Sequence, residues 1–263
     1  MVHFYHLAAG RRGARVRSSG MPPGPTLPGP IDELVDALAA MPGVVAVVLG
    51  GSRAAGSADP ASDWDLGVYY RGALDTAALA ARGTVHPPGA WGRLMNGGAW
   101  LTVAGAKVDV LLRDLDVVDH WCARAVDGTF EVDLLLGYVA GLPTYSLFAE
   151  RAIAQLLRGA LAPVGPYPAR LSERAPERWH FSWRFSLDHA RMRAVRGDRV
   201  GTFGQAAKAV VERAHAVLCE RRIWALNEKR IVEAAGLGEV QARFADPAND
   251  LVAWLDGVEQ ALR

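Results

Sequence analysis

The feature that most constrains the fold is an apolar run that ends abruptly at two glycines. Val44 to Leu49 is rich in valine and has no polar residue, which is typical of a strand buried on both faces. Gly50 and Gly51 follow at once, and Ser52 adds a hydroxyl. Because glycine has no Cβ, its backbone N–H groups can approach a bulky anion closely. With a first helical turn starting at Arg53, this pattern predicts a site for a phosphate-bearing ligand.

The chain resumes as a second apolar strand, 64–70, after a spacer of ten residues that is rich in Gly, Ser, Asp and Pro. Asp63 and Asp65 lie two residues apart at its start, so their carboxylates point to the same side, with Cα atoms roughly 7 Å apart. Two such carboxylates repel each other unless a cation lies between them, and hard oxygen ligands suit Mg²⁺. Each acid alone is also consistent with a turn or a helix cap. The combination indicates phosphoryl or nucleotidyl transfer.

The arrangement of Gly-Gly-Ser, ten residues and Asp-Trp-Asp resembles the signature of the DNA polymerase β-like nucleotidyltransferase superfamily, over about residues 44–115. The resemblance implies an α+β fold, with a small mixed sheet flanked by helices and an all-helical C-terminal domain after it. It also implies that the glycine turn, Gly50 to Ser52, holds a nucleoside triphosphate and that Asp63 and Asp65 hold Mg²⁺.

Members of this superfamily usually supply a third carboxylate from a later strand, and Asp109 resembles that residue. It is a single acid within the apolar run 107–112, and such an acid is rarely buried without a partner. A turn at 104–106 predicts a hairpin with the run 99–103, which would bring Asp109 beside Asp63 and Asp65 as a metal ligand. An edge-strand acid facing solvent is the alternative.

The pattern changes after Asp114, where apolar residues recur at helical spacing. We therefore expect three parts: a disordered tail over 1–30, a nucleotidyltransferase domain over 31–125 and a helical domain over 126–263. The predicted helices are 31–40, 75–81, 115–126, 129–140, 145–159, 176–196, 200–222, 228–235 and 248–262.

Two groups in the helical part are candidates for the reaction. In several small-molecule enzymes of the superfamily a lysine from the helical domain reaches the triphosphate, and Lys208 resembles it, with Arg53 as a second cation; an exposed helix lysine is the alternative. Glu131, with Asp133 close by, could serve as the general base for the acceptor hydroxyl, as could Asp109. Glu131 and Asp133 are equally consistent with helix-capping acids.

Aromatic residues occur in two clusters. Trp91 and Trp100 lie among loop signals, where they could stack on a base or a ring-shaped acceptor or simply cover the core. Phe181, Phe185 and His189 recur every four residues within an arginine-rich stretch. We interpret them as a core-packing helix face rather than a nucleic-acid contact.

The composition gives no indication of a nucleic-acid or membrane partner. The 263 residues carry a net charge of +1, which gives no global argument for nucleic-acid binding. The two cysteines, Cys122 and Cys219, have no metal-ligand spacing, and no run of about 18 apolar residues predicts a membrane span. We therefore expect a cytoplasmic protein with neither nucleic acid nor membrane as a partner.

The chain is most similar in organisation to bacterial antibiotic nucleotidyltransferases. The resemblance implies Mg²⁺-dependent transfer of AMP from ATP to a hydroxyl of a small molecule, such as an aminoglycoside or a lincosamide, with release of pyrophosphate. The alternatives are an enzyme that modifies a protein or tRNA, as in toxin–antitoxin systems, and a non-catalytic nucleotide-binding module. A homodimer is compatible with the resemblance, although no stretch of the sequence demands one.

Overall fold

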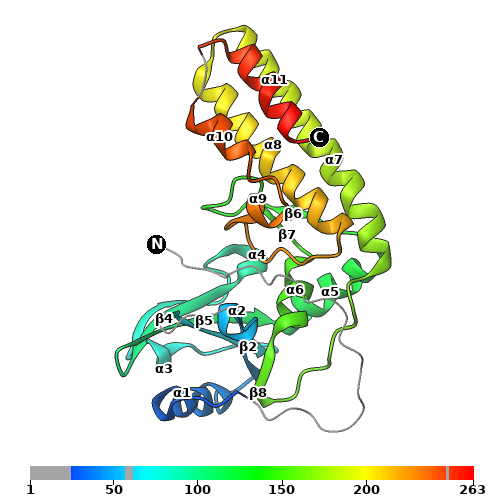
Figure 1. Ribbon diagram of the computed structural model, residues 1–263. Helices are drawn as coiled ribbons and strands as arrows, with labels where there is room; N and C mark the ends of the chain where they lie inside the picture. The colour runs from blue at the N-terminus through cyan, green and yellow to red at the C-terminus, as the bar shows by residue number, and fades with distance from the viewer. Residues whose placement is uncertain (1–24, 57–61, 247–248) are drawn as a thin grey trace. The chain divides into compact units, whose positions relative to one another are not determined.

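The computed structural model describes residues 25–56, 62–246 and 249–263 (Figure 1). The disordered tail expected over 1–30 lies outside the described residues as far as residue 24. Helix α1 (Gly29–Ala39) begins five residues later, with proline at its start and its apolar side buried. This helix was expected at 31–40.

The described residues form the α+β fold that the sequence predicts, and this fold class is confirmed. The strands are β1 (Val44–Leu49), β2 (Trp64–Tyr70), β3 (Gly83–His86), β4 (Gly97–Val103), β5 (Ala106–Asp114), β6 (Val132–Asp133), β7 (Leu142–Pro143) and β8 (Gln155–Gly159). The helices after α1 are α2 (Gly51–Ala54), α3 (Ala77–Ala80), α4 (Gly92–Met95), α5 (Leu115–Val126), α6 (Ser146–Ile153), α7 (Ala169–Val195), α8 (Arg199–Glu220), α9 (Ile231–Ala234), α10 (Val240–Ala245) and α11 (Leu251–Ala261).

The chain divides into two compact units that are interleaved in sequence. The first contains the described residues up to Ala123 together with Leu147–Pro166, and the second contains Arg124–Ser146 and Tyr167–Arg263. We had assigned everything after residue 125 to a helical domain. Residues 147–166 instead belong to the first unit and supply its strand β8.

The first unit is built on a six-stranded sheet in the order β3-β4-β5-β2-β1-β8. Strands β2 and β5 are parallel, whereas the other neighbouring pairs of this sheet are antiparallel. The hairpin expected near 104–106 is present, because β4 and β5 pair on either side of Ala104 and Gly105. The sheet is therefore mixed, as expected.

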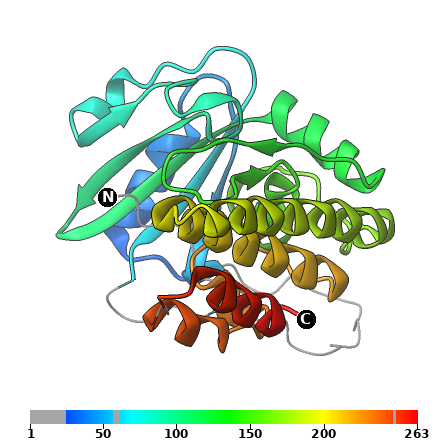
Figure 2. The ribbon, with the colours of Figure 1, turned by 90° about the horizontal axis from the view of Figure 1, so that it is seen from above.

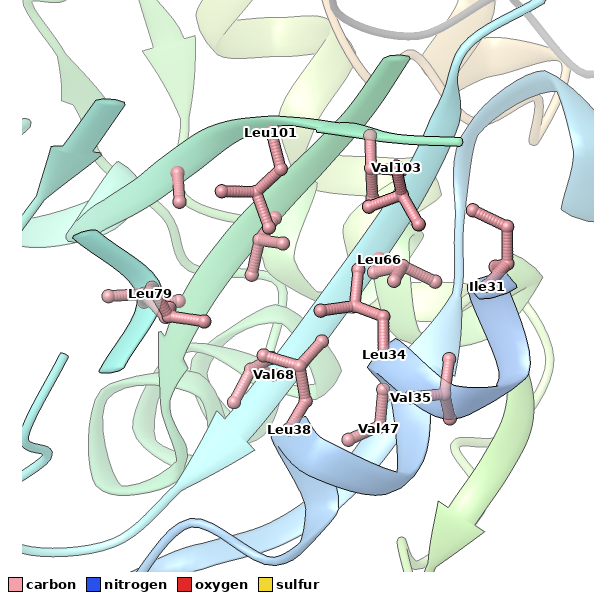
Figure 3. Packing of buried hydrophobic residues seen from close by; sticks show 14 of the residues in the cluster. Ile31, Leu34, Val35, Leu38, Val47, Leu66, Val68, Leu79, Leu101 and Val103 are labelled. Carbon is pink, nitrogen blue, oxygen red and sulfur yellow. The ribbon is translucent and has the colours of Figure 1, made fainter. Parts of the chain in front are cut away.

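One face of this sheet forms the core of the unit. Helix α1 covers it with Leu34 and Leu38, which pack against Leu66 and Val68 of β2 (Figure 3). Alternation along the strands places every second residue on this face. The remaining residues of the cluster come mainly from β1, β4 and β5, and they include Val47, Leu49, Leu101, Val103, Val108, Val110 and Leu112.

The opposite face of the sheet carries polar side chains, and an ion pair with helix α6 covers part of this face. Arg113 of β5, only 1% exposed, donates to both carboxylate oxygens of Glu150 on α6, over 2.7 and 2.8 Å. Tyr69 of β2 is also buried there, and burial, with the nearby Glu150 carboxylate as a second cause, raises its pKa. Sequence reasoning had not identified this cluster, although Arg113 continues the alternation begun by Asp109.

The second unit is centred on the long helices α7 and α8, which run side by side in Figures 1 and 2. Trp179 and Trp183 of α7 are buried, with exposed fractions of 1% and 7%. The expected core stripe was wrong, because Phe181 and Phe185 are 71% and 54% exposed.

Two further helix predictions were wrong over part of their length. Residues 129–140 do not form a helix: β6 pairs there with β7, and the backbone N–H groups of Val139, Ala140 and Gly141 donate to the Glu228 carboxylate. The C-terminal part is therefore not entirely helical. The helix expected over 145–159 ends at Ile153, and Gln155–Gly159 is strand β8.

Candidate functional site

The glycine turn lies directly against the first strand acid. Gly50 donates its backbone N–H to the carbonyl oxygen of Asp65 over 2.8 Å. Gly51 has φ +60°, and a Cβ at this position would meet Asp65 Oδ2 at 1.8 Å. Both the backbone conformation and the lack of space therefore require glycine at position 51. Ser52, which is buried, follows in the single helical turn of α2.

Arg53 holds the returning chain. Its guanidinium donates to the carbonyl oxygens of Ser62 and Asp63, over 2.5 and 3.2 Å, and lies 4.2 Å from the centre of the Trp64 ring. These contacts join the end of the spacer to α2. The structure therefore gives Arg53 a role in positioning Asp63, whereas the sequence had suggested a role as a phosphate ligand.

Asp65 and Asp109 lie next to each other on neighbouring strands. They are direct register partners in the parallel β2–β5 pair, so their side chains point to the same face of the sheet, with backbones about 4.8 Å apart. Their exposed fractions are 5% and 9%. Such nearly buried carboxylates are costly unless they are paired or bind a cation.

Asp63 immediately precedes β2 and is half-buried. Within the described residues, no group of three or more His, Cys, Asp or Glu side chains is placed so that it could hold a metal ion. The donor chemistry nevertheless suits Mg²⁺, because Asp65 and Asp109 bring two carboxylates to adjacent register positions and Asp63 lies two residues from Asp65.

A row of residues crosses the sheet at this level. Trp100 of β4 is the register partner of Asp109, so the row runs from Gly50 through Asp65 and Asp109 to Trp100. The sequence had singled out Trp100 without placing it beside an acid. The signal that could have placed it is the hairpin register, which the short turn at 104–105 largely fixes.

The remaining predicted site residues belong to the second unit. Glu131 exchanges hydrogen bonds with Thr144, its N–H donating to the hydroxyl over 3.1 Å and its carbonyl accepting from the Thr144 N–H over 2.9 Å. Asp133 ends strand β6. Neither acid lies in the helix first turn that we had considered as an alternative.

Lys208 lies on α8 with its side chain 41% exposed and its Nζ 3.8 Å from Glu212 Oε1. Glu212, which the sequence had not suggested, is nearly buried and accepts a hydrogen bond from the Ser186 hydroxyl over 2.7 Å. Burial raises its pKa. The structure thus brings the glycine turn, Asp65 and Asp109 together within the first unit, and places Lys208 and Glu131 in the other.

The glycine turn thus packs against a pair of neighbouring strand acids on one face of the mixed sheet. The sequence of residues 31–118 matches the family described as nucleotidyltransferase domain. The match includes the glycine turn together with Asp63, Asp65 and Asp109, and does not extend into the second unit. Residues 31–118 of the chain therefore form a nucleotidyltransferase domain.

Several solved structures are similar to this chain. A nucleotidyltransferase-like protein from Exiguobacterium sibiricum 255-15 has 15% identity and a TM-score of 0.42, covering 89% of this chain and 73% of that chain. An aminoglycoside 6-adenyltransferase from Bacillus subtilis has 9% identity and a TM-score of 0.29, covering 89% and 88%. No curated protein sequence gives a significant match. Among the described residues, no helix is both long and apolar enough to span a membrane.

Proposed function

We propose that the protein transfers AMP from ATP to a hydroxyl group of a small molecule and releases pyrophosphate, in a reaction that requires Mg²⁺. The observation that carries this proposal is the contact between Gly51 and the Asp65 carboxylate, with Asp109 in register beside it. A triphosphate held at the turn would have its α-phosphorus close to both acids.

The chain's own residues have distinct roles in this proposal. Asp63, Asp65 and Asp109 would hold Mg²⁺, which, when bound, neutralises charge on the triphosphate and on the departing pyrophosphate. The backbone of Gly50 and Gly51, with the Ser52 hydroxyl, would hold the β and γ phosphates. Because charge neutralisation is the main contribution to phosphoryl transfer, loss of one metal-binding acid should cost orders of magnitude in rate.

The acceptor hydroxyl needs a base. Asp109 is the stronger candidate in our proposal, because it lies in the same unit and the same row as Asp65. Glu131, in the second unit, is the other candidate, and Lys208 is a candidate for neutralising the leaving group. A general base contributes typically 10²–10⁴-fold, so Glu131→Gln and Lys208→Met test these two assignments separately.

Pyrophosphate release tests the proposal. The wild-type protein is incubated with Mg²⁺, each of the four NTPs in turn, and one class of acceptor: aminoglycosides, lincosamides, total tRNA or a protein extract. The mass of each acceptor is then measured by mass spectrometry. We expect release with ATP and a small acceptor heavier by one AMP. In Asp65→Asn and Asp109→Asn, we expect the rate to fall at least roughly 10³-fold.

The control is Asp188→Asn, which makes the same chemical change at an exposed position on α7 and should retain the wild-type rate. Near-wild-type turnover in Asp65→Asn would contradict the metal-site assignment. If a protein or tRNA gained the nucleotide and no small molecule did, the acceptor would be a macromolecule instead. Nucleotide binding without turnover would favour a non-catalytic binding module.

A further inference from the structure

Three aromatic rings form a cluster on the polar face of the first unit's sheet. The ring centroids of Trp91 and Trp100 lie 5.6 Å apart, and His86 lies 4.9 Å from Trp91 and 4.5 Å from Trp100. Gly98 makes room for them, because a Cβ there would meet the Trp91 ring at 2.5 Å. All three rings are half-buried, so part of each remains open to solvent.

This aromatic cluster continues the row of the candidate site. Trp100 is paired with Asp109 in the β4–β5 register, and cross-strand partners on one face have Cβ atoms about 4.5–5.5 Å apart. Along the row the order is glycine turn, Asp65, Asp109 and Trp100. The cluster therefore lies on the side of the acids that is opposite to the turn.

The geometry of the proposed reaction indicates which ligand would lie on that side of the acids. In an in-line displacement the attacking oxygen and the leaving group lie on opposite sides of the phosphorus. If the glycine turn holds the phosphates that leave, the attacking hydroxyl must approach from the side of Asp109 and Trp100. The ribose oxygen of the nucleotide occupies an equatorial position, off this line, so the acceptor rather than the base is directed to the cluster.

We propose that Trp100, Trp91 and His86 form the acceptor subsite, and that the acceptor is a hydroxylated ring compound carrying an amine. This proposal rests on the proposed function. Aromatic faces bind the apolar face of a ring and attract ammonium groups. His86 Nε2 is buried and has no hydrogen-bond partner among the described residues, which leaves this polar atom of the cluster without an internal role.

Binding and turnover are measured separately. The indole N–H signals of the full-length protein are followed by NMR with Mg²⁺ and α,β-methylene-ATP, which cannot transfer AMP, while kanamycin, streptomycin and lincomycin are added in turn. We expect at least one probe to shift the Trp100 signal, identified with Trp100→Phe. Trp100→Ala should weaken that probe's binding roughly tenfold or more, the size expected for a lost ring–cation contact, and leave the nucleotide Kd within about twofold.

Two variants separate binding from folding. Trp100→Phe keeps an aromatic face and should retain most of the probe's affinity. Trp254→Phe makes the same change within the apolar core of the second unit and should leave the probe's affinity unchanged. Probe binding that is equal in wild type and Trp100→Ala would overturn the proposal, as would no binding of any of the three probes. A Trp100 signal that responds only to nucleotide would also overturn it.

The same samples distinguish the two proposals. Pyrophosphate release whose acceptor KM is unchanged in Trp100→Ala would leave the proposed function standing and overturn the subsite. Probe binding at Trp100 without pyrophosphate release or a heavier acceptor would leave the ring-binding site standing and overturn the proposed function.

Discussion

At the scale of single residues, Gly51 is the most tightly constrained of the glycines that the structure describes. Two independent requirements meet there: a left-handed backbone and the Asp65 carboxylate where a Cβ would lie. Gly56 shares only the first, with φ +69° and nothing within 4 Å of its Cβ position. Alanine substitutions at Gly51 and Gly56 can therefore separate the cost of a left-handed backbone, which both share, from the effect of displacing the Asp65 carboxylate, which only Gly51 would cause.

Gly56→Ala should lower the free energy of unfolding by roughly 1–2 kcal/mol, which is the usual cost of a left-handed non-glycine residue, and leave turnover near wild type. Gly51→Ala should cost at least as much and also abolish turnover, because the Asp65 side chain must move. Urea unfolding and pyrophosphate release measure the two effects. Equal turnover in the two variants would contradict a functional role for the Gly51–Asp65 contact.

The strands that carry the candidate acids and the glycine turn could be predicted because each signal is local. Asp109 lies within the predicted apolar strand, whereas Asp63 precedes β2, so a common side for Asp63 and Asp65 stays a prediction. Arg113 was missed because its burial depends on Glu150, which is 37 residues away. Nothing within a strand-length window indicates that distant partner.

At the scale of elements, the Arg113–Glu150 pair joins strand β5 to helix α6. The exposed fractions of the two side chains are 1% and 11%, and Arg113 also donates to the carbonyl oxygen of Met95 over 2.9 Å. Removing one partner leaves a charge that is desolvated and uncompensated, whereas removing both leaves none.

Arg113→Met and Glu150→Leu should each lower the free energy of unfolding by about 3–5 kcal/mol, and the double variant should lose less than the sum of the two. Arg158→Met, which breaks exposed pairs with Asp32 and Asp36, should cost less than about 1 kcal/mol per pair. Urea unfolding of the four proteins tests this. Additive losses at Arg113 and Glu150 would contradict direct coupling between β5 and α6.

Element types were predictable where the periodicity was unambiguous. Helix α7 carries two aromatic stripes offset by two residues, and the prediction that Phe181 and Phe185 form the buried one is wrong. The true stripe continues through Ser186, Ala190 and Ala194, and these small residues let the neighbouring helix approach. Strand β8 was read as helix because a short apolar run fits either period.

At the scale of the whole molecule, the free energy of unfolding in acid depends on buried groups that remain uncharged in the folded second unit. His215 of α8 is 1% exposed and stacks on Trp179, with ring centroids 4.5 Å apart and an interplanar angle of 12°. Its Nδ1 lies 3.4 Å from the Tyr145 hydroxyl. Burial lowers the pKa of His215 from 6.5 to about 3.

This shift makes stability fall in acid. Between pH 6.5 and about 3, the unfolded chain binds a proton at His215 that the folded chain does not. The free energy of unfolding should therefore decrease as the pH falls through this window, by at most about 1.4 kcal/mol per pH unit from this group. His215→Phe should flatten that part of the profile, whereas His120→Gln, at an exposed position, should not. Parallel profiles for wild type and His215→Phe would contradict the assignment.

The division into units could not be predicted from the sequence. A change from strand-like to helix-like periodicity near residue 115 marks where the composition changes, but the contacts that define a compact unit are long-range. Residues 147–166 return to the sheet through the pairing of β8 with β1. A strand of only five residues carries too little local signal for this pairing to be predicted from the sequence.

The return of residues 147–166 has a consequence for how this protein can be cut or recombined. A fragment that stops after the matched family segment would lack β8, and β1 would become an unprotected sheet edge, which invites pairing with other chains. It would also lack Glu150 and leave Arg113 as a buried, uncompensated charge. The first unit is thus not one continuous stretch of sequence, and an exchange of the second unit between relatives must keep residues 147–166 together with the sheet of the first.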